Sequence, residues 1–188
     1  MRAYLVGLSA IVAVTAIASP CSAQGFRAEI HGGFDRVNGN DRGDSGAVYG
    51  VGLGYDLAVG NGAFVGADFS FDESSQKECE ASAIVTNDEL CLRAGRDLAA
   101  GIRGGVTIGE RGKLYALAAY TNARFKSSYT TPAGITSRDA ENLDGFRLGA
   151  GYQHKFAGNA YGKVEYRYSN YEAGVERHQA LVGVGIEF

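Results

Sequence analysis

The chain has 188 residues and a formal net charge of −3, with 28 glycines, two prolines and no tryptophan. The length favours a single domain, and the absence of a basic surplus argues against nucleic-acid binding. We find no convincing amphipathic helix beyond the first residues, which is unusual for a globular domain with this apolar content.

Residues 1–23 have the pattern of a secretory signal peptide. One arginine near the start precedes an apolar run from Tyr4 to Ala18, and small residues follow up to Ala23. We expect cleavage after Ala23, so that residues 24–188 form the exported domain. A lipid anchor on Cys21 is the less favoured alternative, because Pro20 stands where such a site needs a small residue.

Eight segments alternate apolar residues with small or polar ones, which is the period of a β-strand. They cover residues 26–34, 47–57, 63–71, 96–108, 114–125, 146–156, 161–171 and 180–188. Each is about ten residues long, enough for a tilted strand to cross a bilayer. The fifth is the least regular. Its polar residues Asn122, Arg124 and Lys126 share one parity, so we expect the other set to be its apolar face: Tyr115, Leu117, Ala119 and Phe125.

Long polar connections alternate with tight turns along the chain. The long ones cover residues 38–45, 72–91 and 126–144, with a shorter one at 170–176, and the turns contain "AVGNG", "IGERG" and "FAGNA". Outer-membrane barrels have this connectivity, with the long loops outside the cell. The sequence therefore predicts an all-β fold, an eight-stranded antiparallel up-and-down transmembrane β-barrel.

Aromatic residues mark both ends of the predicted apolar face. The turn side has Phe26, Tyr115, Phe156 and Phe188, and the loop side has Phe34, Tyr49, Phe71, Phe125, Phe146 and Tyr168. Two such girdles are typical of membrane barrels. A soluble lipocalin-type barrel would bury its apolar face inside, and a β-sandwich explains neither the girdles nor the terminal phenylalanine.

The opposite face holds charges of both signs in an expected lumen network: Arg27, Glu29, Asp68, Asp97, Arg103, Arg147, Lys163, Glu165 and Arg167. An eight-stranded barrel is just wide enough for its side chains to fill. Because lone buried charges are costly, we expect these groups to pair and plug the lumen. A narrow or gated pore lined by the same residues is the alternative.

The last strand alternates Val182, Val184 and Ile186 and ends on the aromatic Phe188. This ending resembles the C-terminal assembly signal of bacterial outer-membrane proteins. Together with "FRLGAGYQHKF", "KVEYRYSNY" and the stretch from Arg96 to Phe125, it makes residues 24–188 resemble the small porin-like, opacity-type surface antigens, whose barrels are similar to the membrane domain of outer-membrane protein A. The resemblance implies a Gram-negative outer membrane, insertion by its assembly machinery, and contact with lipid and lipopolysaccharide. It implies no shared enzymatic activity.

Two cysteines, Cys79 and Cys91, remain after the signal peptide. In an exported protein they predict a disulfide, which would close a loop of about 13 residues and stabilise the protein by roughly 2–3 kcal/mol. A metal site is not expected, because His31, His154 and His178 are spread over different strands and faces. No cofactor is expected either.

One enzymatic precedent is the lipid A deacylases, barrels with an outward-facing His-x-Ser-Asn and a glutamate. Here "RYSNYE" has Ser169 and Asn170, but Arg167 replaces the histidine and Ser169 has lumen parity. Arginine is no general base near neutral pH. We therefore expect no catalysis. The expected role is envelope structure and surface display by a monomer, with a host or cell-surface ligand at the loops, and a narrow porin-like channel for small solutes as the alternative.

Overall fold

The computed structural model describes residues 25–39, 42–60, 62–82 and 85–188. The predicted signal peptide, residues 1–23, lies outside the described residues. Nine strands and one short 3₁₀ turn follow in chain order: β1 (Phe26–Gly39), β2 (Arg42–Ala58), β3 (Ala63–Ser74), β4 (Lys77–Ala81), β5 (Glu89–Ile108), β6 (Gly112–Thr130), β7 (Thr136–Ala157), β8 (Ala160–Tyr171), η1 (Glu172–Gly174) and β9 (Glu176–Glu187). No helix in these described ranges is long and apolar enough to cross a membrane.

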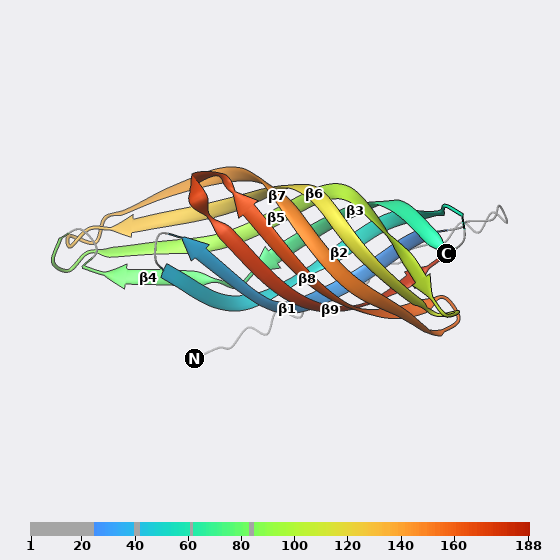
Figure 1. Cartoon of the computed structure of the whole chain (residues 1–188). Coiled ribbons are helices and arrows are strands. Elements are labelled where there is room, and N and C mark those ends of the chain that lie inside the picture. The colour runs from blue at the N-terminus through green and yellow to red at the C-terminus, as the bar shows by residue number, and fades with distance from the viewer. Residues whose placement is uncertain (1–24, 40–41, 61, 83–84) are drawn as a thin grey trace, which may run out of the picture.

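The strands close into a barrel (Figure 1). β1 pairs antiparallel with both β2 and β9, β3 pairs with β5, and each remaining neighbour along the chain pairs in the same way. β4 stands outside this ring of eight and pairs only with β5, beyond the end of β3. The predicted eight-stranded antiparallel barrel is confirmed.

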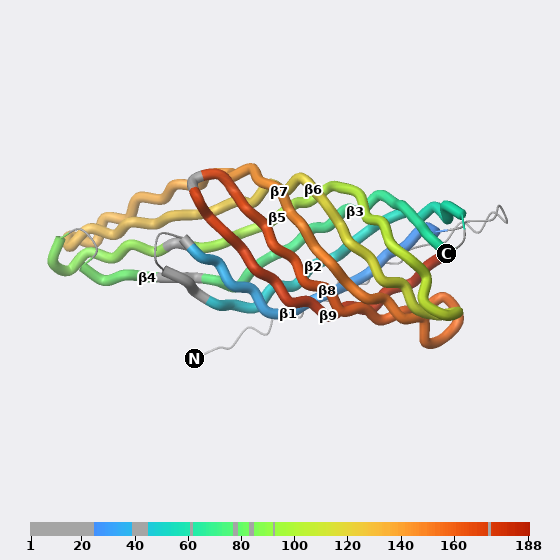
Figure 2. The backbone as a smooth tube through the Cα atoms, in the orientation of Figure 1, coloured from blue at the N-terminus to red at the C-terminus, as the bar shows by residue number. Residues whose placement is uncertain are grey.

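The two ends of the barrel differ. At one end the strands meet in tight turns, where Gly60, Gly62, Gly109 and Gly158 have positive φ and the C-terminus lies nearby (Figure 1). At the other end β5, β6 and β7 run far past their neighbours and, with β4, form a sheet that projects from the barrel (Figure 2). We call β4 and the parts of β5, β6 and β7 at residues 89–96, 124–130 and 136–143 the extension.

The extension corrects one prediction. The segment 126–144 was expected to be a loop, but β6 continues to Thr130 and β7 begins at Thr136, so only residues 131–135 turn. Residues 38–45 likewise lie mostly in β1 and β2, which pair as far as Gly39 and Arg42. These strands lack the apolar–polar alternation by which the others were recognised, because both of their faces contact water. Their backbone groups still pair across the ladder.

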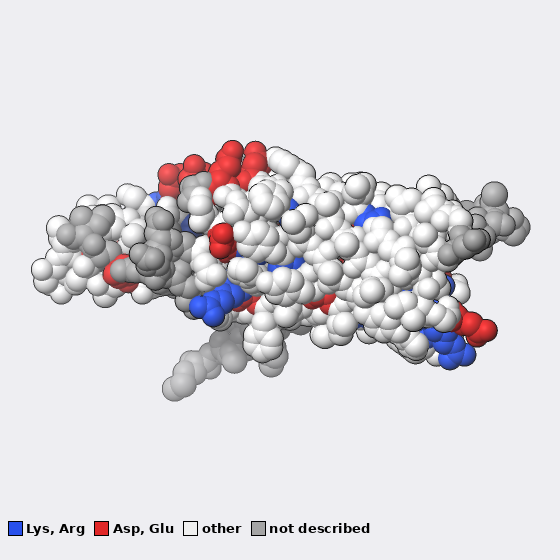
Figure 3. Space-filling view, viewed as in Figure 1, with Lys and Arg blue, Asp and Glu red and all other residues white. Residues whose placement is uncertain are grey.

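The burial pattern assigns one face of each strand to the outside. Outward residues are apolar and exposed, for example Ile30 at 62%, Phe34 at 78% and Val182 at 63%. On the face drawn in Figure 3, the charged residues gather toward the two ends and leave the middle of the barrel mostly uncharged. An uncharged apolar band flanked by charged ends is the surface that a bilayer requires.

The predicted faces of the fifth strand are wrong. In β6, Tyr115 and Leu117 are buried and pack with Phe64 inside the barrel, while Leu114 and Tyr120 are exposed. Ala119 is partly buried against the same cluster, and the Phe125 ring lies edge-on to buried Tyr171, with centroids 6.2 Å apart. Tyr115 and Phe125 therefore do not belong to the girdles.

The error arose from the polar residues used to set the parity. Asn122, Arg124 and Lys126 do point outward, but they lie where β6 leaves the apolar band, past the exposed Tyr120. Outward residues need to be apolar only where they contact lipid. Parity read from the end of the strand therefore gave the reverse assignment for its middle.

Candidate functional site

The lumen contains a chain of ion pairs that starts near the turn end. Asp56 on β2 accepts hydrogen bonds from Arg103, at 2.8 Å from Nε, and from Lys113 at 3.2 Å. Lys113 also donates to Glu187 at 2.7 Å, and Arg27 is paired with Asp68. The Arg103 guanidinium lies 4.8 Å from the Tyr115 ring centroid, a cation–π distance.

The middle of the lumen is organised by two glutamates. Glu29 on β1 is paired with Lys163 on β8 and accepts a 2.8 Å hydrogen bond from the Tyr161 hydroxyl. Glu165 is paired with Arg167, and Lys163 lies 3.2 Å from it. The Tyr115 hydroxyl donates to Glu165 at 2.5 Å, so this inward-facing tyrosine has a partner for its polar end.

Three aspartates gather the arginines at the loop end. Asp72 lies 2.5 Å from His31 Nε2 and accepts from Arg167 at 3.1 Å and Arg147 at 3.3 Å. Asp97 accepts from Arg147 at 2.5 Å, Arg177 at 2.8 Å and two hydroxyls, those of Thr121 and Tyr171. Arg177 also donates to Asp35 at 2.7 Å.

Glycines on β2 make room for these long side chains. A Cβ added at Gly54 would collide with the Arg27 guanidinium, and one at Gly52 would lie 2.8 Å from the Glu29 carboxylate. The five arginines Arg27, Arg103, Arg147, Arg167 and Arg177 are each at most 2% exposed. Side chains thus fill the lumen, as expected for an eight-stranded barrel.

All nine residues of the predicted lumen network point into the barrel, and the structure joins them into these three groups. The predicted network left out several further members, although parity had already placed His31 on the lumen face: His31, Asp35, Asp56, Asp72, Lys113, Arg177 and Glu187. Asp35 and Asp56 share the parity of the chosen residues and could have been included. Asp72 began a predicted connection and Arg177 preceded the predicted last strand, so neither had an assigned face.

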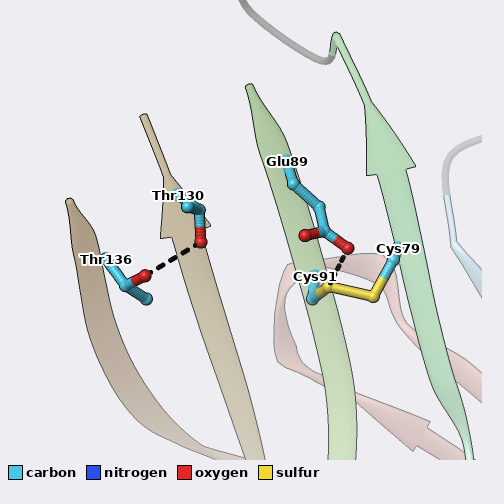
Figure 4. The surroundings of a disulfide bond; sticks show 5 residues. All are labelled: Cys79, Glu89, Cys91, Thr130 and Thr136. Atoms are coloured by element: carbon cyan, nitrogen blue, oxygen red, sulfur yellow. Dashed lines mark hydrogen bonds between the residues drawn. A yellow bond between two sulfur atoms is a disulfide. The ribbon is translucent and has the colours of Figure 1, made fainter. Parts of the chain in front are cut away.

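The extension contains the predicted disulfide between Cys79 and Cys91 (Figure 4). The two residues are directly opposite each other on β4 and β5, so the bond ties the short outer strand to the long one. Glu89 Oε1 lies 3.4 Å from the Cys91 sulfur. Among the described residues these three form the one candidate group of metal ligands, and the disulfide leaves it without thiolates.

Two side-chain hydrogen bonds supplement the backbone ladders of the extension. The Thr130 and Thr136 hydroxyls lie 3.0 Å apart beside the turn between β6 and β7 (Figure 4). The Tyr129 hydroxyl donates to Asp88 at 3.0 Å, and this bond to a carboxylate raises the pKa of the Tyr129 phenol. Both bonds link neighbouring segments near the tip of the extension.

The deacylase-like stretch does not assemble an outward catalytic group. Ser169 is buried and accepts a hydrogen bond from Arg147 Nε at 2.9 Å, and Arg167 belongs to the lumen ion pairs. His178 is on the outer surface and lies 2.6 Å from the Tyr166 hydroxyl. No nucleophilic serine therefore meets a histidine and an acid in residues 167–172.

The last strand seals the barrel. Val182, Val184, Ile186 and Phe188 all point outward, and the Phe188 ring lies 6.0 Å from that of Phe26. The Phe188 N–H donates to the Phe26 carbonyl at 2.8 Å, and the Gly25 N–H donates to the Phe188 carbonyl at 3.0 Å. The terminal residue is thus held by both its backbone and its ring.

A closed ring of antiparallel strands with an apolar exterior and an ionic interior defines a class, the membrane-spanning β-barrels. The family model of the outer membrane protein beta-barrel domain matches residues 6–188. The chain belongs to this family, and the protein lies in the outer membrane. No curated protein sequence matches the chain.

Solved structures share the fold at low sequence identity. The structure of Ail from Yersinia pestis, in complex with the heparin analogue sucrose octasulfate, has a TM-score of 0.58 and 17% identity, covering 87% of this chain and 99% of Ail. Neisserial surface protein A has a TM-score of 0.59 and 16% identity, covering 87% and 97%. The N-terminal barrel of Pseudomonas aeruginosa OprF has a TM-score of 0.50 and 20% identity, covering 88% and 99%.

Proposed function

We propose that this protein is a non-catalytic outer-membrane barrel for envelope structure and surface display, in which the barrel is an anchor and the extension is the working surface. The observation that carries the proposal is the contrast between a lumen filled by ion pairs and a disulfide-tied sheet that projects from one end. Because loops and projecting elements on a rigid scaffold carry most binding functions, ligands would be met at the extension.

The alternative is a narrow channel for small solutes, and one observation favours it. Gln179 on β9 is buried in the lumen at 1% exposure, yet neither of its amide atoms is hydrogen-bonded to the described residues. A buried polar group without a protein partner is usually hydrogen-bonded to a water molecule. A single hydrated position between ion pairs is still short of a continuous path.

Single-channel recording in a planar bilayer separates the two functions. The folded protein should give no steady openings, with folding verified in the same preparation by the change in gel mobility on boiling. Steady openings that change in Arg103→Ala or Arg167→Ala would replace surface display by a channel function, since both side chains cross the lumen.

Val182, Val184, Ile186 and Phe188 are proposed to act as the signal read by the outer-membrane assembly machinery, which would deliver a monomer whose closed ring has no free barrel edge. Deleting Phe188 should lower the folded fraction in the outer membrane of cells, while the purified variant refolds into vesicles. Equal loss in both settings would make Phe188 a stability residue instead.

A further inference from the structure

We propose that the outward face of the extension binds the phosphate groups of an anionic glycolipid in the outer leaflet, through Arg93, Lys126 and Arg138. The inference rests on the proposed surface-display function, because both require the extension to lie outside the cell. It adds the chemical group that is recognised, a phosphate, and the residues that hold it.

The strand register brings the three cations together. Arg93 on β5 is directly opposite Lys126 on β6, and Lys126 is opposite Ala140 on β7, two residues from Arg138 on the same face. Opposite residues on paired strands have Cβ atoms about 5 Å apart, and diagonal ones about 7–8 Å. All three charges therefore lie within reach of a single phosphate-bearing group.

A cavity of about 530 Å³ lies among these side chains. Its lining includes the small residues Cys91, Ser128 and Ala140 between the cations, and Asp139 is the acidic residue among the lining residues. The Asp139 carboxylate already accepts a 2.8 Å hydrogen bond from the Ala140 N–H. The lining thus has three positive charges against one negative charge and offers space for a sugar phosphate.

None of the three cations has an internal partner among the described residues: Arg93, Lys126 and Arg138 form no ion pair or hydrogen bond there. Like charges placed directly opposite on a sheet destabilise it. An anion between Arg93 and Lys126 would remove this repulsion and gain charge-assisted hydrogen bonds.

The direction and height of the cavity select a membrane ligand over a soluble one. Phe125 points inward, toward the ring of Tyr171, so its neighbour Lys126 points outward, on the same side of β6 as the exposed Tyr120. Tyr120 is opposite Phe146 of the loop-side girdle. Lys126 follows Tyr120 by six positions, about 20 Å along the strand, which is about 15 Å above the girdle for a strand tilted by about 40°. The cations therefore face sideways over the headgroup layer, and not upward from the tip.

Binding of lipopolysaccharide by the folded protein in detergent tests the inference. The variant with Arg93→Gln, Lys126→Gln and Arg138→Gln should bind lipopolysaccharide at least about tenfold more weakly than the parent. Higher salt should strongly weaken lipopolysaccharide binding by the parent protein and have little effect on binding by the variant. Arg111→Gln, an exposed arginine in the turn at the opposite end, is the control and should bind like the parent. Dephosphorylated lipopolysaccharide should bind the parent as weakly as the triple variant binds the intact lipid.

Undiminished binding by the folded triple variant would overturn the inference. Soluble heparin binding as tightly as lipopolysaccharide, and lost in the same variant, would overturn the lipid assignment in favour of a soluble polyanion in the same cavity. Channel recordings of the same preparation test the proposed function separately, because openings would leave the binding comparison intact.

Discussion

The lumen and the outward face of the extension are both rich in arginine and lysine, but within the part of the chain that the structure describes these cations are paired with carboxylates only in the lumen. Inside the barrel Arg147 contacts Asp72 and Asp97, and Arg177 contacts Asp35 and Asp97. On the extension, Arg93 and Lys126 lie opposite each other, and among the described residues neither meets a carboxylate. The contrast teaches that a positive charge in this protein depends on a carboxylate partner where it is buried, and is available to a ligand where it is exposed and unpaired.

The largest test of this contrast removes an acid from the lumen. Asp97→Asn leaves two buried arginines short of a partner, so the free energy of unfolding should fall by about 3–5 kcal/mol. Urea titration of the protein in phosphatidylcholine vesicles measures it. The matched change Asp139→Asn in the extension should leave the unfolding midpoint where it is, and equal effects of the two changes would abolish the distinction between the regions.

A second test concerns the corrected faces of β6. Ala118→Arg places a charge on the exposed, lipid-facing side of the barrel wall and should cost about 2–4 kcal/mol in the same titration. Asn142→Arg, on the exposed part of β7 in the extension, should be tolerated because water covers it. If Ala118→Arg were tolerated equally well, the apolar band would not be where the structure places it.

Removing a single tyrosine hydroxyl from each region compares the lumen and the extension by a smaller change. Tyr115→Phe removes the hydroxyl that donates to buried Glu165 and should lower the free energy of unfolding by about 1–3 kcal/mol. Tyr129→Phe removes a similar bond to Asp88 in the extension, and we expect no measurable change in global unfolding. A larger loss from Tyr129→Phe would show that the extension unfolds together with the barrel.

The smallest global effect is expected for the disulfide. Replacing Cys79 and Cys91 together by serine should leave barrel unfolding unchanged, because β4 pairs only with the projecting part of β5. Limited proteolysis should nevertheless cut residues 77–89 faster, since the constraint on this segment is lost. Unchanged cleavage would mean that strand pairing alone holds β4.

The parts of the fold that follow from local pattern were predictable from the sequence. Alternation placed all eight barrel strands, and glycine-containing turns such as "AVGNG" fixed where they reverse. The faces of β6 were not predictable in this way, because its inward face carries the apolar Leu117 and the amphipathic Tyr115, whose partner Glu165 is fifty residues away, while its outward face turns polar past Tyr120. The length of β6 and β7 was hidden by the polar composition of a strand pair that meets water on both sides.

The candidate sites show the same difference between features set by local pattern and features set by contacts between distant segments. Lumen charges could be recognised one strand at a time by parity, but their partners could not, because pairing depends on which strands face each other across the barrel. The cationic cavity was not anticipated at all. Arg93, Lys126 and Arg138 come from three separate segments, and only the pairing register places them side by side.

The ion pairs that cross the barrel also bear on how the protein forms. Glu29 pairs with Lys163 and Asp35 with Arg177, partners separated by 134 and 142 residues along the chain. Contacts this distant in sequence carry a high loop-closure entropy and form slowly. Since β1 meets β9 only at closure, Glu29 and Asp35 gain these two partners only when the first and last strands come together, so the same step that closes the barrel wall also completes the ion pairs inside it.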